Sequence, residues 1–346
     1  MGKSKIARVR ARAAQNGLPG LGWWAMRWLY WRSGLYRTKW HLRPPLRDSL
    51  YLNPLEETAK GRERSLRILQ EQRERYKVIR VNTLRFKVDL KDYAFGRKLF
   101  LNRIWEDYES GLFFQLLQPG MNVLDIGAHI GYYALFAAQR VGSSGRVFAF
   151  EPAPDNFALL AENVRLNRLQ NILTAENLAV SDRTQQLALQ LSEASSGDHR
   201  IFATSAEDDA LFNKNRPRAT HPVQAIAVDE YLGSKRVSRV DAVKMDVQGA
   251  EMNVLRGMEQ TLRANPDLFL FFEYWYFGLK ANGTAPQAPL EFLQNDFGYQ
   301  LFLLDPEARC VKPIERNAFV EWAAAQDPRL QMDLIATRAA LPKEWL

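Results

Sequence analysis

The stretch Val123-Leu-Asp-Ile-Gly-Ala-His-Ile-Gly-Tyr-Tyr133 has the pattern of a buried strand, a glycine turn and the start of a helix. Its first residues are apolar and strand-forming, and residues 134–138 continue as an apolar helix. Gly127 and Gly131 carry no β-carbon, so the backbone can turn sharply there and approach a ligand closely. The N-terminus of the helix that follows would expose unpaired N–H groups to polar or anionic ligand groups.

The spacing of the two glycines separates this turn from a dinucleotide-binding turn, because the middle glycine of Gly-x-Gly-x-x-Gly is missing. Asp125, followed by Gly127-x-x-x-Gly131, resembles motif I of the class I methyltransferases that use S-adenosylmethionine. The resemblance implies that the acid and the turn, with His129 and Tyr132 inside it, hold the amino acid end of that cofactor. The alternative is a tight strand–helix turn without a ligand.

A second apolar run, Arg146–Phe150, ends in the acid Glu151. This acid follows Asp125 by about one β-α-β unit, the distance at which such folds place a carboxylate on ribose hydroxyls. An ionised carboxylate can accept hydrogen bonds from both hydroxyls of a diol. We therefore predict that Glu151 binds the cofactor ribose, with an exposed charge at a strand end as the alternative.

A third strand is predicted within Asn171–Asp182. In related folds the end of this strand lines the adenine pocket. We assign Asn177 to that pocket through its side-chain amide and Ala179 through its backbone. The alternative for Asn177 is an amide that stabilises the turn.

Two further apolar strands are followed by or end in acids, and these acids are the candidates for the reaction itself. Asp246 follows the strand 242–245, and Glu273 ends the strand 268–273. Ligands bind at the carboxyl ends of strands in open α/β sheets. We predict that the two acids orient an acceptor and receive its proton. The alternatives are a hydrogen bond to the cofactor for Asp246 and an ordinary strand-end acid for Glu273.

Two weaker candidates lie in less regular stretches. Glu109 precedes a helix predicted over Leu112–Leu117 and could close over the cofactor, or it could simply favour the helix N-terminus. His199 lies in the polar loop 192–220, which we interpret as a substrate-side loop with His199 as an acid/base candidate.

Four blocks together resemble the FkbM family of methyltransferases: Leu124–Tyr133, Phe150–Pro152, Ala179–Asp182 and Val243–Gly257. The resemblance extends from about Val78 to Arg338, and its specific part is Lys-x-Asp-Val-x-Gly-Ala-Glu at 244–251. It implies a transferase that uses S-adenosyl-L-methionine and O-methylates a small-molecule or glycan hydroxyl acceptor, such as a sugar, glycolipid or secondary metabolite.

One residue departs from the family pattern, since Gln248 stands where the family usually has Glu. If that acid orients substrate, its loss weakens the implied role; if it caps the helix, Gln can replace it. The alternative function is therefore a non-catalytic S-adenosylmethionine-binding protein that acts at a membrane surface or on a partner.

The expected fold is α/β: a Rossmann-like class I methyltransferase fold with a mostly parallel sheet and a terminal antiparallel hairpin, 299–304 with 334–337. Strands at 77–81 and 84–90 are expected to form a hairpin that leads into this domain. We predict the methyltransferase domain at 78–346. Residues 1–77 form a basic, Trp-rich arm with a helical extension over Glu56–Tyr76.

Charge is concentrated in this arm: residues 1–47 hold eleven Lys or Arg and no acid, against a net charge of +8 for the chain. Tryptophans mixed with arginines suit an anionic membrane surface, and they also suit packing on the domain or on a second subunit. Nucleic-acid binding is the least favoured reading. The single cysteine indicates a reducing, cytoplasmic setting, with possible peripheral membrane attachment. The scattered histidines predict no metal site.

Overall fold

The computed structural model describes residues 65, 67–193, 195–202 and 218–345. By internal contacts the chain divides into Met1–Leu52 and Asn53–Leu346, and every described residue belongs to the second unit. The predicted membrane arm, residues 1–47, therefore lies outside the described residues. The domain boundary at 77/78 stays a prediction.

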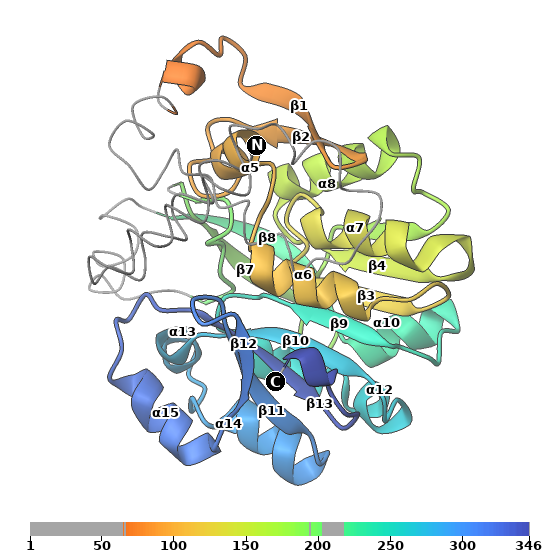
Figure 1. Ribbon diagram of the computed structural model, residues 1–346, viewed down its shortest axis with the longest axis vertical. Helices are drawn as coiled ribbons and strands as arrows, with labels where there is room; N and C mark the ends of the chain where they lie inside the picture. Colours follow the sequence, from red (N-terminus) through yellow and green to blue (C-terminus); the bar gives the residue numbers. More distant parts are fainter. Residues whose placement is uncertain (1–64, 66, 194, 203–217, 346) are drawn as a thin grey trace, which may run out of the picture. The chain divides into compact units, whose positions relative to one another are not determined.

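An eight-stranded sheet, in the order β12-β11-β13-β10-β9-β3-β4-β5, forms the centre of the fold (Figure 1). Neighbours from β5 to β10 are parallel, whereas β13 is antiparallel to both β10 and β11. The strands of this sheet are β3 Asn122–Ile126, β4 Arg146–Phe150, β5 Leu173–Glu176, β9 Ala242–Met245, β10 Phe269–Tyr274, β11 Gln300–Asp305, β12 Cys310–Pro313 and β13 Met332–Thr337. This confirms the predicted Rossmann-like methyltransferase fold with its terminal antiparallel hairpin.

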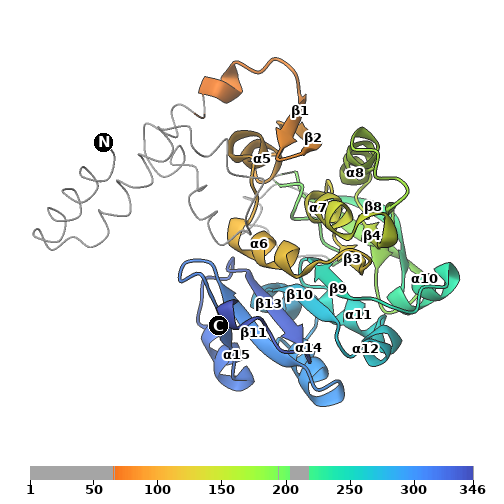
Figure 2. The same cartoon turned by 45° about the vertical axis from the view of Figure 1, so that its right-hand side comes forward.

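The strand order reverses between β3 and β9, so the chain leaves β3 on one side and returns on the other. The carboxyl ends of β3 and β9 flank a crevice at such a reversal, which is where open α/β sheets bind ligands. The turned view shows β9 and β10 beside β3, with α6 Asp107–Leu116 crossing near them (Figure 2).

Alternating residues of the central strands enter two separate cores, one on each face of the sheet. Val123 and Val147 join the core built with α6, α7 Tyr132–Val141 and α8 Pro154–Leu166. Leu124 and Phe148 join the core built with α10 Val228–Lys235, α11 Glu251–Arg256 and α12 Glu259–Ala264. Because successive strand residues point to opposite faces, helices must cover both.

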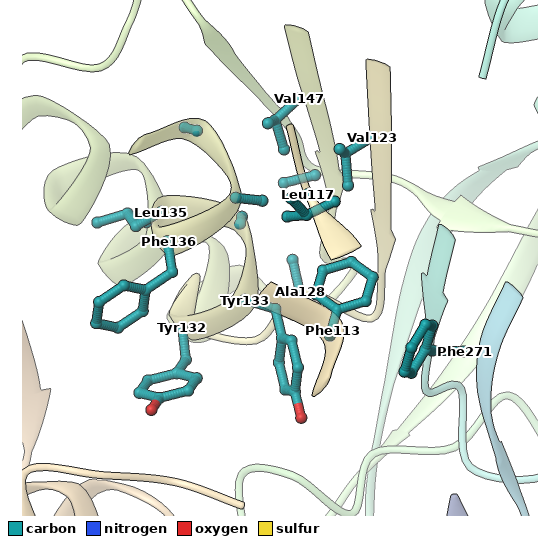
Figure 3. Close-up of a cluster of buried hydrophobic side chains, with 14 of the residues drawn as sticks. Phe113, Leu117, Val123, Ala128, Tyr132, Tyr133, Leu135, Phe136, Val147 and Phe271 are labelled. Atoms are coloured by element: carbon teal, nitrogen blue, oxygen red, sulfur yellow. The ribbon is translucent and has the colours of Figure 1, made fainter. Parts of the chain in front are cut away.

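Aromatic side chains join α6 to the sheet and to the turn after β3 (Figure 3). The ring centroids of Phe113 and Phe271 are 5.1 Å apart, and those of Phe113 and Tyr133 are 5.7 Å apart. In Figure 3 the hydroxyl groups of Tyr132 and Tyr133 point away from the aliphatic residues around Val123. The packing thus fixes the start of α7 against α6.

Two smaller sheets complete the described fold. The predicted hairpin is present as β1 Tyr76–Val81 and β2 Leu84–Asp89. On either side of the polar loop lie β7 Gln185–Leu191 and β8 Ala219–Ile226, which pair with each other, and β8 also pairs with the short β6 Ala179–Val180. The remaining helical segments are α5 Gly96–Asn102, η3 Gly142–Ser144, α13 Tyr276–Ala281, α14 Ala288–Glu291, η4 Phe292–Asp296, α15 Arg316–Ala324 and η5 Lys343–Trp345.

Two helix predictions were wrong in their bounds. Helix α6 begins at Asp107 rather than Leu112. The helical residues described before β1 end at 70, because Tyr76 already belongs to the hairpin. After Asp246 the chain forms two helices, α11 and α12, which are separated at Gly257, where a β-carbon would lie 2.0 Å from the carbonyl oxygen of Ser181. Strand β12 and helix α15 were not predicted.

Candidate active site

A cavity of about 430 Å³ opens at the carboxyl ends of β3, β4, β9 and β10. Its volume lies within the range of small-molecule binding sites. Eight of the ten residues predicted for cofactor binding and catalysis line it: Asp125, Gly127, His129, Tyr132, Glu151, Ala179, Asp246 and Glu273. The fold therefore gathers at one place residues that span about 150 positions of sequence.

The turn after β3 is held in a conformation that needs glycine. Gly127 has a φ of +84°, and its N–H and that of Ala128 donate to the carbonyl oxygen of Phe150 at 3.0 and 2.9 Å. Gly131 has a φ of +90°, but a β-carbon there would meet Leu135 and Leu160 at 2.5 and 2.6 Å. Gly131 thus permits close packing at the start of α7, and it does not line the cavity.

Glu151 is buried, with 5% of its surface exposed, so the alternative of an exposed strand-end charge is wrong. Its Oε2 accepts the N–H of His129 at 2.8 Å and its Oε1 accepts the N–H of Ala153 at 2.9 Å. Burial raises the pKa of Glu151 to about 7 although these N–H groups oppose the shift. Each carboxylate oxygen can still accept a further hydrogen bond, which suits a ribose diol.

Asp125 ends the central strand with an unsatisfied acceptor. It is 3% exposed, and its Oδ2 takes no hydrogen bond from the described residues. Burial raises the pKa of Asp125 to about 7, with Lys244 acting in the opposite direction. Buried polar atoms are nearly always paired, so this oxygen fits a ligand that brings a donor or a positive charge. The amino acid end of S-adenosylmethionine supplies both.

Asp246 and Glu273 meet at the end of the cavity through a shared donor. Gln248 Nε2 lies 2.8 Å from Asp246 Oδ1 and 2.8 Å from Glu273 Oε2, and Gln331 Nε2 donates to Gln248 Oε1 at 2.8 Å. Burial raises the pKa of both acids, and the charge of Asp246 raises that of Glu273 further. The two acids thus lie at the ends of the paired strands β9 and β10, and their roles stay predictions.

Lys244 and Glu106 also line the cavity, and neither was predicted as a site residue. Lys244 Nζ lies 3.2 Å from Asp333 Oδ1. Burial alone would lower the pKa of Lys244, but the surrounding carboxylates, Asp333 foremost, raise it. Glu106 Oε2 accepts the hydroxyl of Tyr133 at 2.8 Å. The motif Lys-x-Asp at 244–246 carried a signal for Lys244, but nothing in the sequence distinguished Glu106 from its acidic neighbours.

A chain of polar contacts joins the glycine turn to the loop 195–202. His129 Nε2 is 2.7 Å from Ser196 Oγ, and Ser196 Oγ donates to Asp92 Oδ2 at 2.7 Å. Asn156 Nδ2 donates to the carbonyl oxygen of Ser196 at 2.9 Å. Burial lowers the pKa of His129 to about 4, so its ring is neutral near pH 7. These contacts place the loop on the cavity beside the cofactor turn.

Two of the predicted residues, Asn177 and Glu109, have other surroundings than expected, and a third, His199, lies on the cavity. The amide of Asn177 donates to the carbonyl oxygens of Glu151 and Pro152 at 2.9 and 3.1 Å, and Asn177 does not line the cavity. Glu109 lies in the first turn of α6 and likewise does not line it. His199 does line it, with Nδ1 accepting the N–H of Ser192 at 3.0 Å and a pKa lowered to about 4 by burial.

The described residues form neither a cluster of metal ligands nor a membrane-spanning helix. No group of three or more His, Cys, Asp or Glu side chains in that part of the chain is arranged to hold a metal ion. Nor do the described helices include one of the length and apolar character needed to cross a bilayer.

Comparison with known proteins assigns the domain. The family model described as the Methyltransferase FkbM domain matches residues 125–301, just over half of the 346 residues. The match spans the glycine turn, Glu151, both acids of the Asp246–Glu273 pair and the strands that carry them.

Curated relatives share this region at low identity. Methyltransferase 1 of Beauveria bassiana is 30% identical over 40% of this chain and 58% of its own length. Hexuronic acid methyltransferase AglP of Haloferax volcanii is 29% identical over 40% of this chain and 51% of its own. The 31-O-demethyl-FK506 methyltransferase FkbM of Streptomyces tacrolimicus is 28% identical over 41% and 61%. The chain thus spans about half to three fifths of the length of these relatives.

Proposed function

Because this chain belongs to the FkbM family of methyltransferases, whose cofactor is S-adenosylmethionine, we propose that its cavity transfers the methyl group of that cofactor to a hydroxyl oxygen. One observation carries the proposal: a buried carboxylate oxygen, Asp125 Oδ2, that has no partner among the described residues and lies beside a glycine turn. When bound, the cofactor supplies a methyl group already activated on a sulfonium.

In this proposal Glu151 and Asp125 bind different parts of the cofactor. The carboxylate of Glu151 accepts hydrogen bonds from the ribose hydroxyls. The hydrogen bonds that it accepts from the backbone N–H groups of His129 and Ala153 hold the turn in place. Asp125 faces the amino acid end, and Ala179, at the start of β6, lines the part of the cavity assigned to adenine. Gly127 lets the turn pack directly on the backbone of Asp246, since any side chain there would collide with it.

The acceptor would meet the Asp246–Glu273 pair. Two neighbouring carboxyl groups resist ionising together, so the pair favours one charge and one proton. Burial raises the pKa of both acids, and the pKa of Glu273 lies well above its usual value, so Glu273 is the acid assigned the proton. Asp246 is then the acceptor of the hydroxyl proton as a C–O bond forms and the C–S bond breaks, with the electron pair passing to sulfur.

The same end of the cavity carries side chains suited to a small polyol. Gln248 and Gln331 offer amides, and Arg200, whose guanidinium lies 4.5 Å from the centre of the buried Trp275 ring, lines the same cavity. A few fixed polar groups that set the orientation of a ligand are typical of specific ligand sites. Two relatives are named for a hexuronic acid and for a 31-O-demethyl compound, which supports a sugar, glycolipid or secondary-metabolite hydroxyl as acceptor here.

The test is transfer of an isotope-labelled methyl group from S-adenosylmethionine to a panel of sugars, glycolipids and polyketide alcohols. We expect labelled ether in at least one class, and its loss in Asp246→Asn. Labelled product on nitrogen or carbon acceptors alone would contradict O-methylation.

The second candidate is a binding protein without turnover, and Gln248 in place of the family's usual Glu is the observation that favours it. In this chain the Gln248 amide supplies a hydrogen bond to each acid of the pair, which a carboxylate could not do. Cofactor binding with no labelled product over the whole panel would favour this second function. Product that disappears in Asp246→Asn would exclude it.

A further inference from the structure

We propose that Glu106 receives the α-ammonium group of S-adenosylmethionine, opposite Asp125, and so selects ligands that keep the amino acid end. The inference rests on the proposed cofactor site and adds to it a residue and a ligand group. Glu106 lies on the cavity wall, as does Asp125.

The backbone of Glu106 is in a conformation that favours glycine. It has a φ of 44° and a ψ of 63°, the left-handed region, immediately before α6. A residue with a β-carbon is disfavoured there by about 1–2 kcal/mol. Such conformations concentrate at functional sites, where the surrounding structure holds them.

The usual reason for an acid at this position does not apply. Acids before a helix commonly accept backbone N–H groups of its first turn. Glu106 is the N-cap residue of α6, yet its side chain makes no capping hydrogen bond. The side chain therefore has no capping role that would offset its backbone conformation.

The carboxylate is directed instead to the cofactor turn. Its Oε2 accepts the hydroxyl of Tyr133, a residue of the first turn of α7, at 2.8 Å. Its Oε1 takes no hydrogen bond from the described residues, so one oxygen is left for a ligand in the cavity. Tyr133 thus fixes Glu106 beside the predicted position of the amino acid end.

The charges around Glu106 favour a cation there. Lys244, the positive group that acts on Glu106, forms its ion pair with Asp333 at 3.2 Å. Burial raises the pKa of Glu106 to about 8, and the negative charge of Asp333 adds to the shift. A bound ammonium group would favour the ionised form. Cofactor binding near pH 7 would therefore release a proton from Glu106.

Glu109 provides a matched control, because it lies about one helical turn from Glu106 on the same short segment. Burial raises the pKa of Glu109 to about 7, yet its side chain does not line the cavity. A change of Glu109 to Gln removes a partly buried acid of the same type without touching the proposed subsite.

The experiment compares two ligands by calorimetry on the full chain: S-adenosylhomocysteine, and 5′-methylthioadenosine, which lacks the amino acid end. We expect Glu106→Gln to lower the affinity for S-adenosylhomocysteine about 10–100-fold, which is the effect of losing a hydrogen bond between charged groups. The affinity of Glu106→Gln for methylthioadenosine should change less than about threefold. Glu109→Gln should change the affinity for neither ligand.

Proton release gives a second reading of the same titration. Binding heats in two buffers of different ionisation enthalpy should show more proton release near pH 7 in the wild type and in Glu109→Gln than in Glu106→Gln, in which Asp125 still responds to the ligand. Glu106→Gly separates the backbone from the side chain, since glycine accepts the left-handed conformation but removes the hydrogen-bond acceptor of Tyr133.

The outcomes separate this inference from the function on which it rests. An equal loss of affinity for both ligands in Glu106→Gln, or no loss of affinity for either, would overturn the inference and leave the proposed cofactor site intact. Reduced methyl transfer at unchanged S-adenosylhomocysteine affinity would also overturn it, by placing Glu106 on the acceptor. If the wild type binds neither ligand, the proposed function fails first.

Discussion

The backbone of Asp246 leaves no room for a side chain at Gly127: a β-carbon built there would lie 1.9 Å from the carbonyl oxygen of Asp246. The glycine turn after β3 and the carboxyl end of β9 are thus in direct backbone contact. The same contact brings Asp246 beside the turn that holds Asp125, since Asp246 N–H donates to the carbonyl oxygen of Ile126 at 2.9 Å.

Replacement of Gly127 by Ala should therefore destabilise the protein more than its φ of +84° alone would. Gly283 provides the control, because its φ is +73° and no atom lies within 4 Å of the point that a β-carbon would occupy. We expect Gly283→Ala to cost about 1–2 kcal/mol in the free energy of unfolding. Gly127→Ala should cost clearly more in urea denaturation, and an equal cost would refute the contact.

Glu151→Ala should weaken the binding of S-adenosylhomocysteine by about 1–3 kcal/mol, because the ribose hydroxyl groups would lose their hydrogen-bond acceptor. Glu151 also anchors the N–H groups of His129 and Ala153, so part of any effect comes from the turn. A ligand lacking both ribose hydroxyls separates the two contributions. Its affinity should fall less than that of the parent ligand, and an equal fall would assign Glu151 to the turn alone.

Gln248→Glu should lower stability in a pH-dependent way. A third acid would replace the donor shared by Asp246 and Glu273, leaving both without that hydrogen bond. The new acid would have a pKa raised in the folded state, so the folded state would bind more protons than the unfolded state above about pH 4.5. The variant should therefore lose stability as the pH rises through 5 to 8.

Thermal melts at pH 5 and pH 8 measure this, with Gln224→Glu as the control for adding an acid on an exposed residue of β8. We expect the melting temperature of Gln248→Glu, relative to the wild type, to fall further at pH 8 than at pH 5. A difference of the same size at both pH values would show that the Gln248 amide does not couple the two acids.

Much of the site was predictable because motif residues stand next to strand ends. Asp125, Glu151, Asp246 and Glu273 each lie at or just after the end of an apolar run, and parallel strands bring such ends to one edge. Their shared cavity follows from that topology. Glycine spacing predicted the turn, but it did not tell that Gly131 serves helix packing while Gly127 faces the cavity.

The residues that were missed depend on backbone geometry and long-range contacts. In Trp105-Glu-Asp-Tyr-Glu109 three acids are similar by pattern, and only the left-handed turn at Glu106 decides which one enters the cavity. The Gln248 bridge joins the ends of two strands to the segment before β13. Helix α6 begins early because Tyr108 and Ser110 are buried, which its acidic sequence did not indicate.

The basic arm carries a prediction that concerns location. Residues 24, 28 and 31 are tryptophans spaced to form one helical stripe, and Arg27 and Arg32 adjoin them. Each basic residue near an anionic surface contributes roughly 1 kcal/mol to binding. Removal of residues 1–47 should abolish flotation with anionic liposomes and leave S-adenosylhomocysteine affinity unchanged. Full-length protein that does not float with anionic liposomes, or a truncated protein that aggregates, would contradict membrane attachment.

The most direct test of the central claim is a calorimetric titration of the full chain with S-adenosylhomocysteine, repeated with Asp125→Asn. The account predicts one site per chain in the wild type. It also predicts affinity at least about tenfold weaker in the variant, because an amide cannot balance the positive end of the ligand as a carboxylate does. Absence of binding at hundreds of micromolar, or equal affinity in the two proteins, would contradict it.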